Sequence, residues 1–132
     1  MKKVFVLFLL IGFIFSCKKN TEQSNPADLI GSWKLAQVLS DPGDGSGTFH
    51  SVSSDKILEF HPDGTITSNG AVCNLSSESN SSTTGTYSLV DSTIQSTSCS
   101  DQNFKIRFTT KGSTLTVYYP CYEACAAKFV KN

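Results

Sequence analysis

The sequence predicts an all-β domain, an antiparallel up-and-down meander of about eight short strands that closes into a small barrel. No segment after residue 31 has the 3.6-residue apolar period of an amphipathic helix. Short runs rich in β-branched and aromatic residues recur instead, and Gly, Pro, Asn and Asp separate them. Closing the meander removes the exposed strand edges that an open sheet leaves.

Alternation of apolar and polar residues defines the individual strands. The clearest strand has Phe104, Ile106 and Phe108 on one face, with charged side chains between them. The next strand places Leu115 and Val117 on one face in the same way. The expected strands cover residues 31–40, 49–60 (clearest from 56), 64–69, 85–90, 93–98, 104–110, 114–119 and 126–131.

The N-terminus has the features of an export signal. Lys2 and Lys3 precede an apolar run over residues 4–15, which is shorter than the roughly twenty residues of a membrane-spanning helix. Residues 14–17, Ile-Phe-Ser-Cys, resemble a bacterial lipobox, in which an aliphatic residue and a small residue precede the cysteine that is lipidated. The resemblance implies a lipoprotein signal peptide over residues 1–16.

Cys17 would then carry diacylglycerol and a palmitate-type acyl chain at the mature N-terminus. Residues 17–28 would form the lipidated cysteine and a flexible polar tether, and residues 29–132 a single domain. Lys18 rather than Asp follows the cysteine, so the expected location is the outer membrane of a bacterial cell envelope. The alternative is plain cleavage and secretion, which leaves Cys17 free.

Charge excludes one class of partner. Loss of Lys2 and Lys3 with the signal leaves the mature chain slightly acidic, and no basic stripe is visible along it. The expected partners are therefore a membrane, reached through the N-terminal lipid anchor, and a small hydrophobic ligand, but not nucleic acid.

Four cysteines remain besides Cys17, and an even number in an exported chain favours two disulfides. Of the three pairings, we expect Cys121–Cys125 across a tight turn, with Cys73–Cys99 as the remaining pair. A four-thiolate zinc site is the alternative, but only one Cys-x2-4-Cys knuckle is present. A redox role is less favoured because the spacing is Cys-x3-Cys.

Gly31-Ser32-Trp33 at the start of the first strand resembles the Gly-x-Trp start of lipocalins. The chain from Leu29 to Asn132 is similar to short lipocalin-like lipoproteins of Gram-negative bacteria. The features that carry this similarity are residues 31–33, Phe-His-Pro-Asp-Gly-Thr at 60–65, Gly-Thr-Tyr at 85–87 and Pro-Cys-x3-Cys at 120–125. The resemblance implies a lipocalin-like barrel in which Trp33 plugs one end beneath a basic residue, with Lys128 as the first choice and Lys131 as the second.

No catalytic or metal-binding pattern emerges from the sequence. His50 and His61 would lie far apart on an extended strand. The Gly- and Asp-rich loop 41–47 fails the EF-hand pattern because Gly43 and Val52 occupy ligand positions. We therefore expect no enzymatic activity, no cofactor and no metal.

Two functions remain. The first is a lipid-anchored envelope barrel that binds a small apolar ligand or lipid in its interior, with lining residues Trp33, Phe104, Ile106, Phe108, Leu115 and Val117. The alternative is a protein-binding module, for example an inhibitor of an extracellular or periplasmic enzyme. It would act through loops 41–47 and 74–84 and three nearby tyrosines, Tyr118, Tyr119 and Tyr122. A connected cavity would favour the ligand, and a filled interior with an exposed aromatic patch would favour the protein partner.

Overall fold

The computed structural model describes residues 26–101 and 104–132 of the chain. The predicted signal peptide, the lipobox, Cys17 and most of the tether lie outside the described residues. The elements are α1 (Pro26–Leu29), β1 (Gly31–Ser40), β2 (His50–Ser51), β3 (Ile57–Phe60), β4 (Thr65–Ser68), β5 (Thr83–Ser88), β6 (Thr93–Gln95), β7 (Ile106–Lys111), β8 (Thr114–Tyr118) and β9 (Cys125–Lys131).

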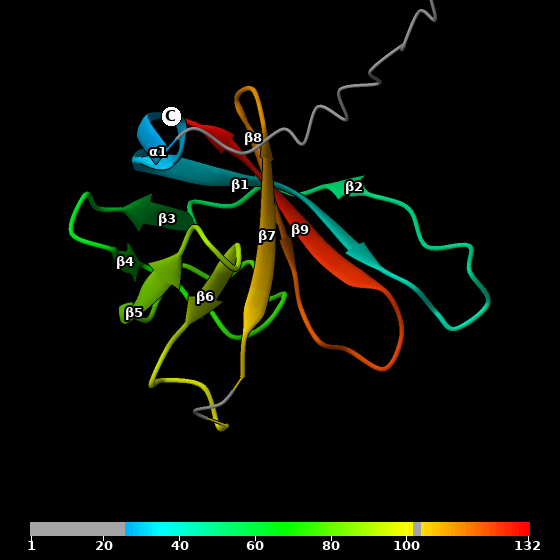
Figure 1. The fold of residues 1–132 in the computed structure, drawn as a ribbon. Helices are drawn as coiled ribbons and strands as arrows, with labels where there is room; N and C mark the ends of the chain where they lie inside the picture. The colour runs from blue at the N-terminus through cyan, green and yellow to red at the C-terminus, as the bar shows by residue number, and fades with distance from the viewer. Residues whose placement is uncertain (1–25, 102–103) are drawn as a thin grey trace, which may run out of the picture.

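The predicted fold class is confirmed, because eight antiparallel strands close into a barrel and β2 is one additional strand. From β3 to β9 each strand pairs with the next in sequence, and β1 pairs with β3 on one edge and with β9 on the other (Figure 1). β2 and β3 both lie along the same edge of β1, so the expected strand over residues 49–60 is a single extended segment with an irregular middle.

Two strands are shorter than expected: β7 begins later and β8 ends earlier. Phe104 precedes β7 rather than lying within it, and its amide N–H donates to the Asp101 carbonyl oxygen in a turn. Tyr119 follows the last residue of β8, although its side chain still points inward and is buried. Local turn hydrogen bonds at these positions compete with the strand ladder, and alternation alone does not reveal them.

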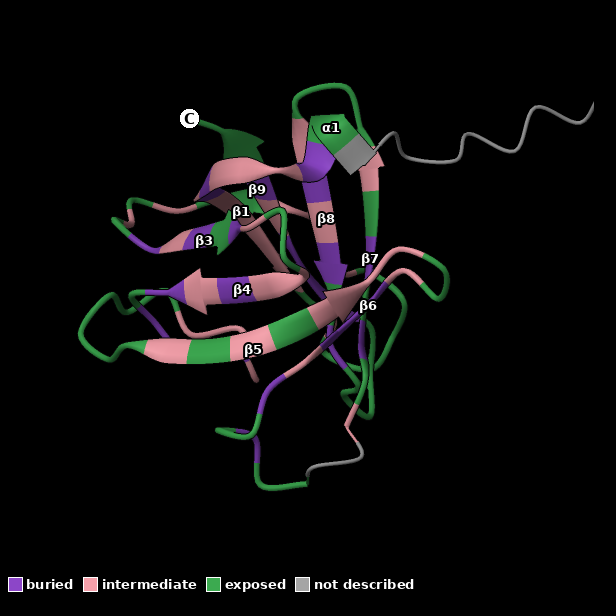
Figure 2. Cartoon of the chain, turned by 60° about the vertical axis from the view of Figure 1, so that its left-hand side comes forward, coloured by how far each residue is buried: buried purple, intermediate pink, exposed green. Residues whose placement is uncertain are grey.

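Alternation of burial along the strands builds the core. In β8, Leu115 and Val117 are buried and the residues between them are more exposed, which Figure 2 shows as alternating bands. β7 follows the same pattern with Ile106 and Phe108. The Phe60 ring meets Phe108 edge to face, with ring centroids 5.8 Å apart, so opposite walls of the barrel touch across its centre.

The two ends of the barrel differ in construction. Short turns at residues 61–64, 89–92 and 112–113 lie at the end where α1 enters. The longer connections 41–49, 69–82 and 119–124 lie at the other end, as do residues 96–101 and 104–105 between β6 and β7. An up-and-down meander forces this division, because successive connections alternate between ends. We call the first the tether end and the second the long-loop end; Figure 1 shows α1, the β7–β8 turn and the C-terminus gathered at the tether end.

Trp33 closes the tether end. The side chain is fully buried, and its Nε1–H donates to the Leu29 carbonyl oxygen at 2.8 Å. Gly31 has φ +118°, a backbone conformation that favours glycine, and this turns the chain from α1 into β1. The prediction that Trp33 and Leu35 share the inward face of the first strand is confirmed, since both are buried.

The first-choice basic partner of Trp33 was wrong. Lys131 is paired with Trp33 across the β1–β9 ladder, and its Nζ lies 5.2 Å from the centroid of the Trp ring. Lys128 is three residues earlier, and alternation therefore places it on the outer face, where its Nζ lies 3.9 Å from the centroid of the Phe49 ring. The Lys131 ammonium also donates to the Asp28 carbonyl oxygen, which ties β9 to α1.

Both predicted disulfides are present, Cys73–Cys99 and Cys121–Cys125. Their Cα atoms are 5.4 and 6.0 Å apart, within the range that a disulfide bridges. All four cysteines lie at the long-loop end or on the first residue of a strand there. The covalent cross-links therefore reinforce the end of the barrel that has the longest connections.

Candidate functional site

The barrel interior is filled by the side chains that were expected to line a ligand cavity. Trp33, Ile106, Phe108, Leu115 and Val117 are brought together in one core cluster and are each at most 1% exposed. Further members of the same cluster are Leu29, Leu35, Leu58, Phe60, Ile66, Ile94 and Phe129. Phe104 packs only against the edge of this cluster and is half-buried. Packing of this kind leaves the core residues in contact with one another rather than with a ligand.

The mouth of the barrel at the long-loop end is also covered. Val72 and Cys99 belong to the core cluster, and Leu75 packs against it, so the 69–82 connection folds over the opening. Gly70 makes this close approach feasible, since an added Cβ atom would lie 2.2 Å from the Glu78 carbonyl oxygen. The Cys73–Cys99 disulfide then holds this connection against the one that follows β6.

Lys56 anchors the covering loop from inside. Its side chain is only 1% exposed, and its Nζ donates to the Ser76 carbonyl oxygen at 2.7 Å. Burial lowers the pKa of the Lys56 ammonium from 10.5 to about 8, because the charged form loses its hydration. Sequence reasoning missed this residue, because a lysine at the start of a strand is ordinarily exposed.

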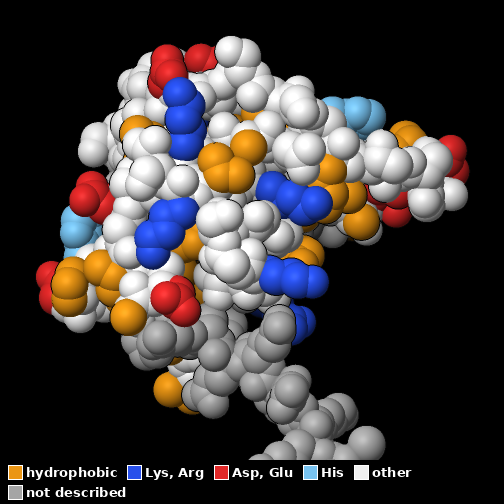
Figure 3. All heavy atoms as spheres, turned by 90° about the horizontal axis from the view of Figure 1, so that it is seen from above, with side chains coloured by type: hydrophobic (Ala, Val, Ile, Leu, Met, Phe, Trp, Pro, Cys, Tyr) orange, Lys and Arg blue, Asp and Glu red, His pale blue; other side chains and the backbone are white. Residues whose placement is uncertain are grey.

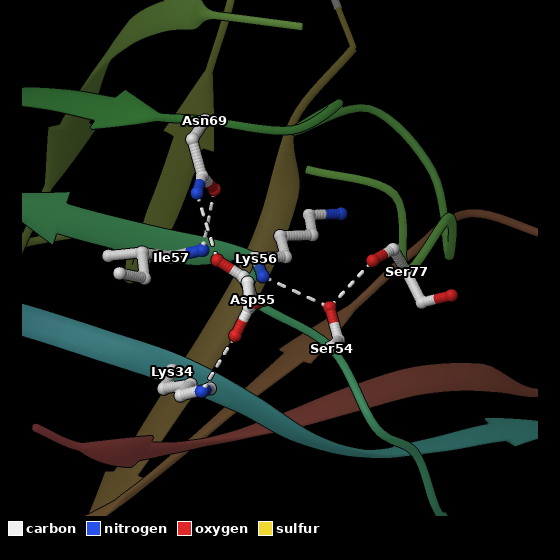
Figure 4. A network of polar contacts seen from close by, with 7 residues as sticks. All are labelled: Lys34, Ser54, Asp55, Lys56, Ile57, Asn69 and Ser77. Atoms are coloured by element: carbon white, nitrogen blue, oxygen red, sulfur yellow. Dashed lines mark hydrogen bonds and ion pairs between the residues drawn. The ribbon is translucent and has the colours of Figure 1, made fainter. Parts of the chain in front are cut away.

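A polar network surrounds Lys56 and joins the loop to β3 (Figure 4). The Ser54 hydroxyl accepts from the Lys56 amide N–H and donates to the Ser77 carbonyl oxygen at 2.6 Å. Asn69 bridges the Ile57 amide N–H and the Asp55 carbonyl oxygen, each at 2.8 Å. The network fixes the 69–82 connection with several directed hydrogen bonds, in addition to its apolar contacts.

The 41–49 loop is organised by one carboxylate. Asp41 accepts hydrogen bonds from the amide N–H groups of Gly43, Gly45 and Gly47, at 2.7 to 3.1 Å. These bonds, the one from Gly43 first, lower the pKa of Asp41 because they stabilise the ionised carboxylate. Both oxygens of this carboxylate thus accept hydrogen bonds from the loop itself. These bonds fix the conformation of the loop, which projects from the barrel.

An aromatic edge lies beside this projection on the outer wall of the barrel. Its residues are Phe49, Tyr118 and Tyr122. Tyr118 is opposite Ala126 in the β8–β9 ladder, and Ala126 is opposite Leu39 in the β1–β9 ladder, so these side chains form one outward row. The row lines a hollow of about 330 Å³, together with Phe49 and Tyr122.

Exposure separates the three tyrosines that the sequence groups together. Tyr118 is 45% exposed and Tyr122 is fully exposed. Tyr119 points into the barrel, where burial raises the pKa of its phenol. Tyr122 lies within the ring closed by Cys121 and Cys125, and the Asp41 amide N–H donates to the Ala124 carbonyl oxygen beside it. The 41–49 and 119–124 loops are therefore held side by side.

Other hollows of the surface have a different chemistry. Spaces of about 500 and 610 Å³ lie on the outer wall of β3–β6 and share Thr67. Hydroxyl and amide side chains dominate their lining, among them Thr65, Thr84, Thr86 and Gln95. These open polar grooves do not match the apolar ligand expected from the sequence.

Neither histidine lies in a catalytic arrangement within the described residues. His61 Nε2 is 3.1 Å from the Thr67 hydroxyl oxygen, and His50 is exposed on β2. Among residues 26–101 and 104–132, no three His, Cys, Asp or Glu side chains are grouped so that they could hold a metal ion. In the same part of the chain, no helix has the length and apolarity needed to cross a membrane.

The structural features that distinguish this barrel therefore lie mainly at the long-loop end of the described chain. It contains both disulfides, a buried lysine, a carboxylate-organised loop and the aromatic edge. Comparison with models of protein families, with curated proteins and with solved structures finds no significant match to this chain.

Proposed function

We propose that this protein is a lipid-anchored protein-binding module of the bacterial cell envelope that acts through its long-loop end. The observation that carries the proposal is the pairing of a filled, covered interior with an exposed aromatic edge on cross-linked loops. The proposal assigns the barrel a scaffolding role and no catalytic step. It therefore favours the protein partner over the small apolar ligand.

The interior argues against a resident ligand on energetic grounds. A ligand among Ile106, Phe108 and Val117 would have to displace side chains that already fill the space, and overpacking a core typically costs about 1–3 kcal/mol for even a few added methylene groups. Entry would also require the 69–82 connection to leave its hydrogen bonds with Lys56 and Ser54.

The aromatic edge supports the protein partner. Tyrosine buries a large area with few rotatable bonds, and it is enriched where interfaces derive most of their binding energy. The Cys121–Cys125 ring and the Asp41 hydrogen bonds restrict the two loops that flank Tyr122. Loops that are already ordered lose less entropy on binding.

Changing Tyr122 to serine is expected to abolish capture of an envelope partner while leaving the fold intact. The side chain contacts solvent only, so its removal costs little stability. Truncation of an interface tyrosine commonly weakens binding by about 2 kcal/mol or more. The measurement is quantitative cross-linking and affinity capture in envelope extracts, with thermal unfolding of each variant.

Val90→Ser is the matched control, because Val90 is 95% exposed at the tether end. The same partner should be captured by the parent and by Val90→Ser, and lost with Tyr122→Ser. Equal loss with both variants would contradict an interface at the long-loop end. Native mass spectrometry supplies a second check, since a stoichiometric small molecule retained by the purified protein would favour the ligand-binding alternative.

Lipid anchoring rests on the lipobox resemblance and has its own test. Cys17→Ala should move the protein from the membrane fraction to the soluble fraction and abolish labelling with a fatty-acid analogue. Three acyl chains provide stable anchoring, whereas one chain alone binds only marginally. Cys17→Ser serves as a second variant with the same expectation. If both variants still fractionate with membranes, the lipid anchor is wrong.

A further inference from the structure

One wall of the barrel is rich in cations. The strands β7, β8, β9 and β1 contain no Asp or Glu. Their outward positions include Arg107, Lys111, Lys128 and Lys34, and exposed Lys105 immediately precedes β7. We call this surface the basic wall.

The strand registers arrange these cations in parallel rows. Arg107 is opposite Tyr118, and Lys111 is opposite Thr114, which is opposite Val130 in turn. Thr116 is opposite Lys128 in the row between them. Neighbouring strands are about 4.8 Å apart, so the charges cover an area and not a line. Figure 3 views the molecule from the top of Figure 1 and shows several blue Lys and Arg side chains together with red Asp and Glu side chains; some of the blue ones lie beside orange hydrophobic side chains near the projecting loop.

Most of these cations are available to a partner. Among the described residues, Lys34 forms the one ion pair, with Asp55 at 3.0 Å, and Arg107, Lys111 and Lys128 form none. Val130 is exposed between them and adds apolar surface. A surface on which most cations have no ion pair, with an exposed apolar residue among them, has the composition of a membrane-surface contact.

The described carboxylates lie off these four strands, and Asp28, Asp55, Glu59, Asp63 and Asp91 are at the tether end or on and beside β3. Those at the long-loop end are Asp41, Asp44, Glu78, Asp101 and Glu123. An anionic surface would attract the basic wall and repel the surfaces that carry these carboxylates. Such a surface would therefore orient the barrel with the basic wall toward it.

We infer that the basic wall docks the barrel on an anionic phospholipid surface, which in the cell is the membrane that holds its lipid anchor. This inference rests on the anchor in the proposed function. The eight residues between Cys17 and α1 reach at most about 28 Å when extended, so the anchor keeps the wall within reach of the bilayer. A short tether holds the basic wall near the bilayer at an effective concentration in the millimolar range. An attraction that is weak for a free protein is then sufficient for docking.

The test separates the wall from the anchor. The mature chain from residue 17, with Cys17→Ser, is mixed with vesicles of phosphatidylcholine alone or with phosphatidylglycerol added, at low and at physiological salt. Every residue of the core cluster lies between Leu29 and Phe129, so the barrel keeps its core in this chain. We expect sedimentation with the anionic vesicles only, decreasing as salt rises.

Arg107→Gln, Lys111→Gln and Lys128→Gln in combination should weaken vesicle binding more than tenfold. Each basic residue near an anionic surface contributes a factor of about five to the binding constant. The control is a second triple variant, Asn80→Asp, Gln95→Glu and Thr97→Glu. It changes the net charge by the same amount, on the opposite side of the barrel. It should bind within about threefold of the parent, because charges beyond a Debye length of about 8 Å are screened.

Three outcomes overturn the inference. The first is equal binding to both kinds of vesicle, and the second is an equal loss in the two triple variants. The third is binding to soluble polyglutamate as tight as to the anionic vesicles, which assigns the wall to an acidic protein. None of these results involves Tyr122 or lipidated Cys17, so the protein-binding and anchoring proposals are tested independently of this one.

Discussion

Trp33→Ala is expected to unfold the barrel or to lower its melting temperature sharply. Trp33 is fully buried at the tether end, and truncation of such a side chain costs about 3–5 kcal/mol. The variant also leaves the Leu29 carbonyl oxygen without its Nε1–H donor, which adds about 1 kcal/mol or more. A domain of this size is held together by only about 5–15 kcal/mol. Chemical denaturation followed by circular dichroism measures the difference.

Lys131→Met provides the control at the same end. It retains most of the packing against the Trp33 ring but removes the charge and the hydrogen bond to the Asp28 carbonyl oxygen. The loss should be about 0.5–2 kcal/mol from the ring contact and about 1 kcal/mol more from the hydrogen bond. Lys128→Met should leave the tether end unaffected, because Lys128 lies on the outer wall. As the sole tryptophan, Trp33 should also have blue-shifted fluorescence that moves to the red on unfolding. Native emission equal to that of free tryptophan in water would refute the plug.

Lys56→Met is expected to stabilise the protein at neutral pH. Burial makes the Lys56 ammonium costly, and the fall in its pKa from 10.5 to about 8 corresponds to a penalty of up to about 3 kcal/mol at pH 7. Met fills nearly the same volume and carries no charge. The gain is reduced by the lost hydrogen bond to the Ser76 carbonyl oxygen, about 1 kcal/mol.

The pH dependence has a definite sign. Between pH 8 and 10 the unfolded chain holds a proton on Lys56 that the folded chain increasingly loses, so the free energy of unfolding rises with pH. The advantage of Lys56→Met should shrink across the same window. Above pH 10 the raised pKa of Tyr119 acts in the opposite direction, because the unfolded phenol ionises first. Urea titrations of the parent and of Lys56→Met at pH 7, 8, 9 and 10 test this expectation. If the difference in free energy of unfolding between the two proteins does not change with pH, Lys56 is not a buried charged group.

The barrel could be predicted because its strands are locally consistent. Alternation at Ile106, Phe108, Leu115 and Val117 directly encodes which face is buried. The partner of Trp33 could not be chosen in the same way, because it depends on the register between β1 and β9, strands about a hundred residues apart. A shift of three residues separates Lys128 from Lys131 and moves the side chain to the other face of the sheet.

The features of the long-loop end and of the basic wall were harder to read from sequence. Lys56 is buried because the 69–82 connection folds back over it, and no local sequence pattern predicts that contact. Arg107, Lys111 and Lys128 come from two strands separated by a third, so they form no run along the chain. The disulfides were predictable because four cysteines permit few pairings, and one pair is only four residues apart.

Closure of the barrel by β1 and β9 has a consequence for how the chain is made. Synthesis delivers a polypeptide from its N-terminus, so β9, which closes the barrel against β1, is the last strand to arrive. Until residues 125–131 are free to pair, β1 and β8 both present unsatisfied edges, and such edges recruit other chains. Contacts between distant parts of a sequence also form slowly. A chain that ends just before Cys125 would therefore keep both edges unpaired and would be prone to aggregation or proteolysis. Pairing of the seven residues of β9 is the step that completes the barrel.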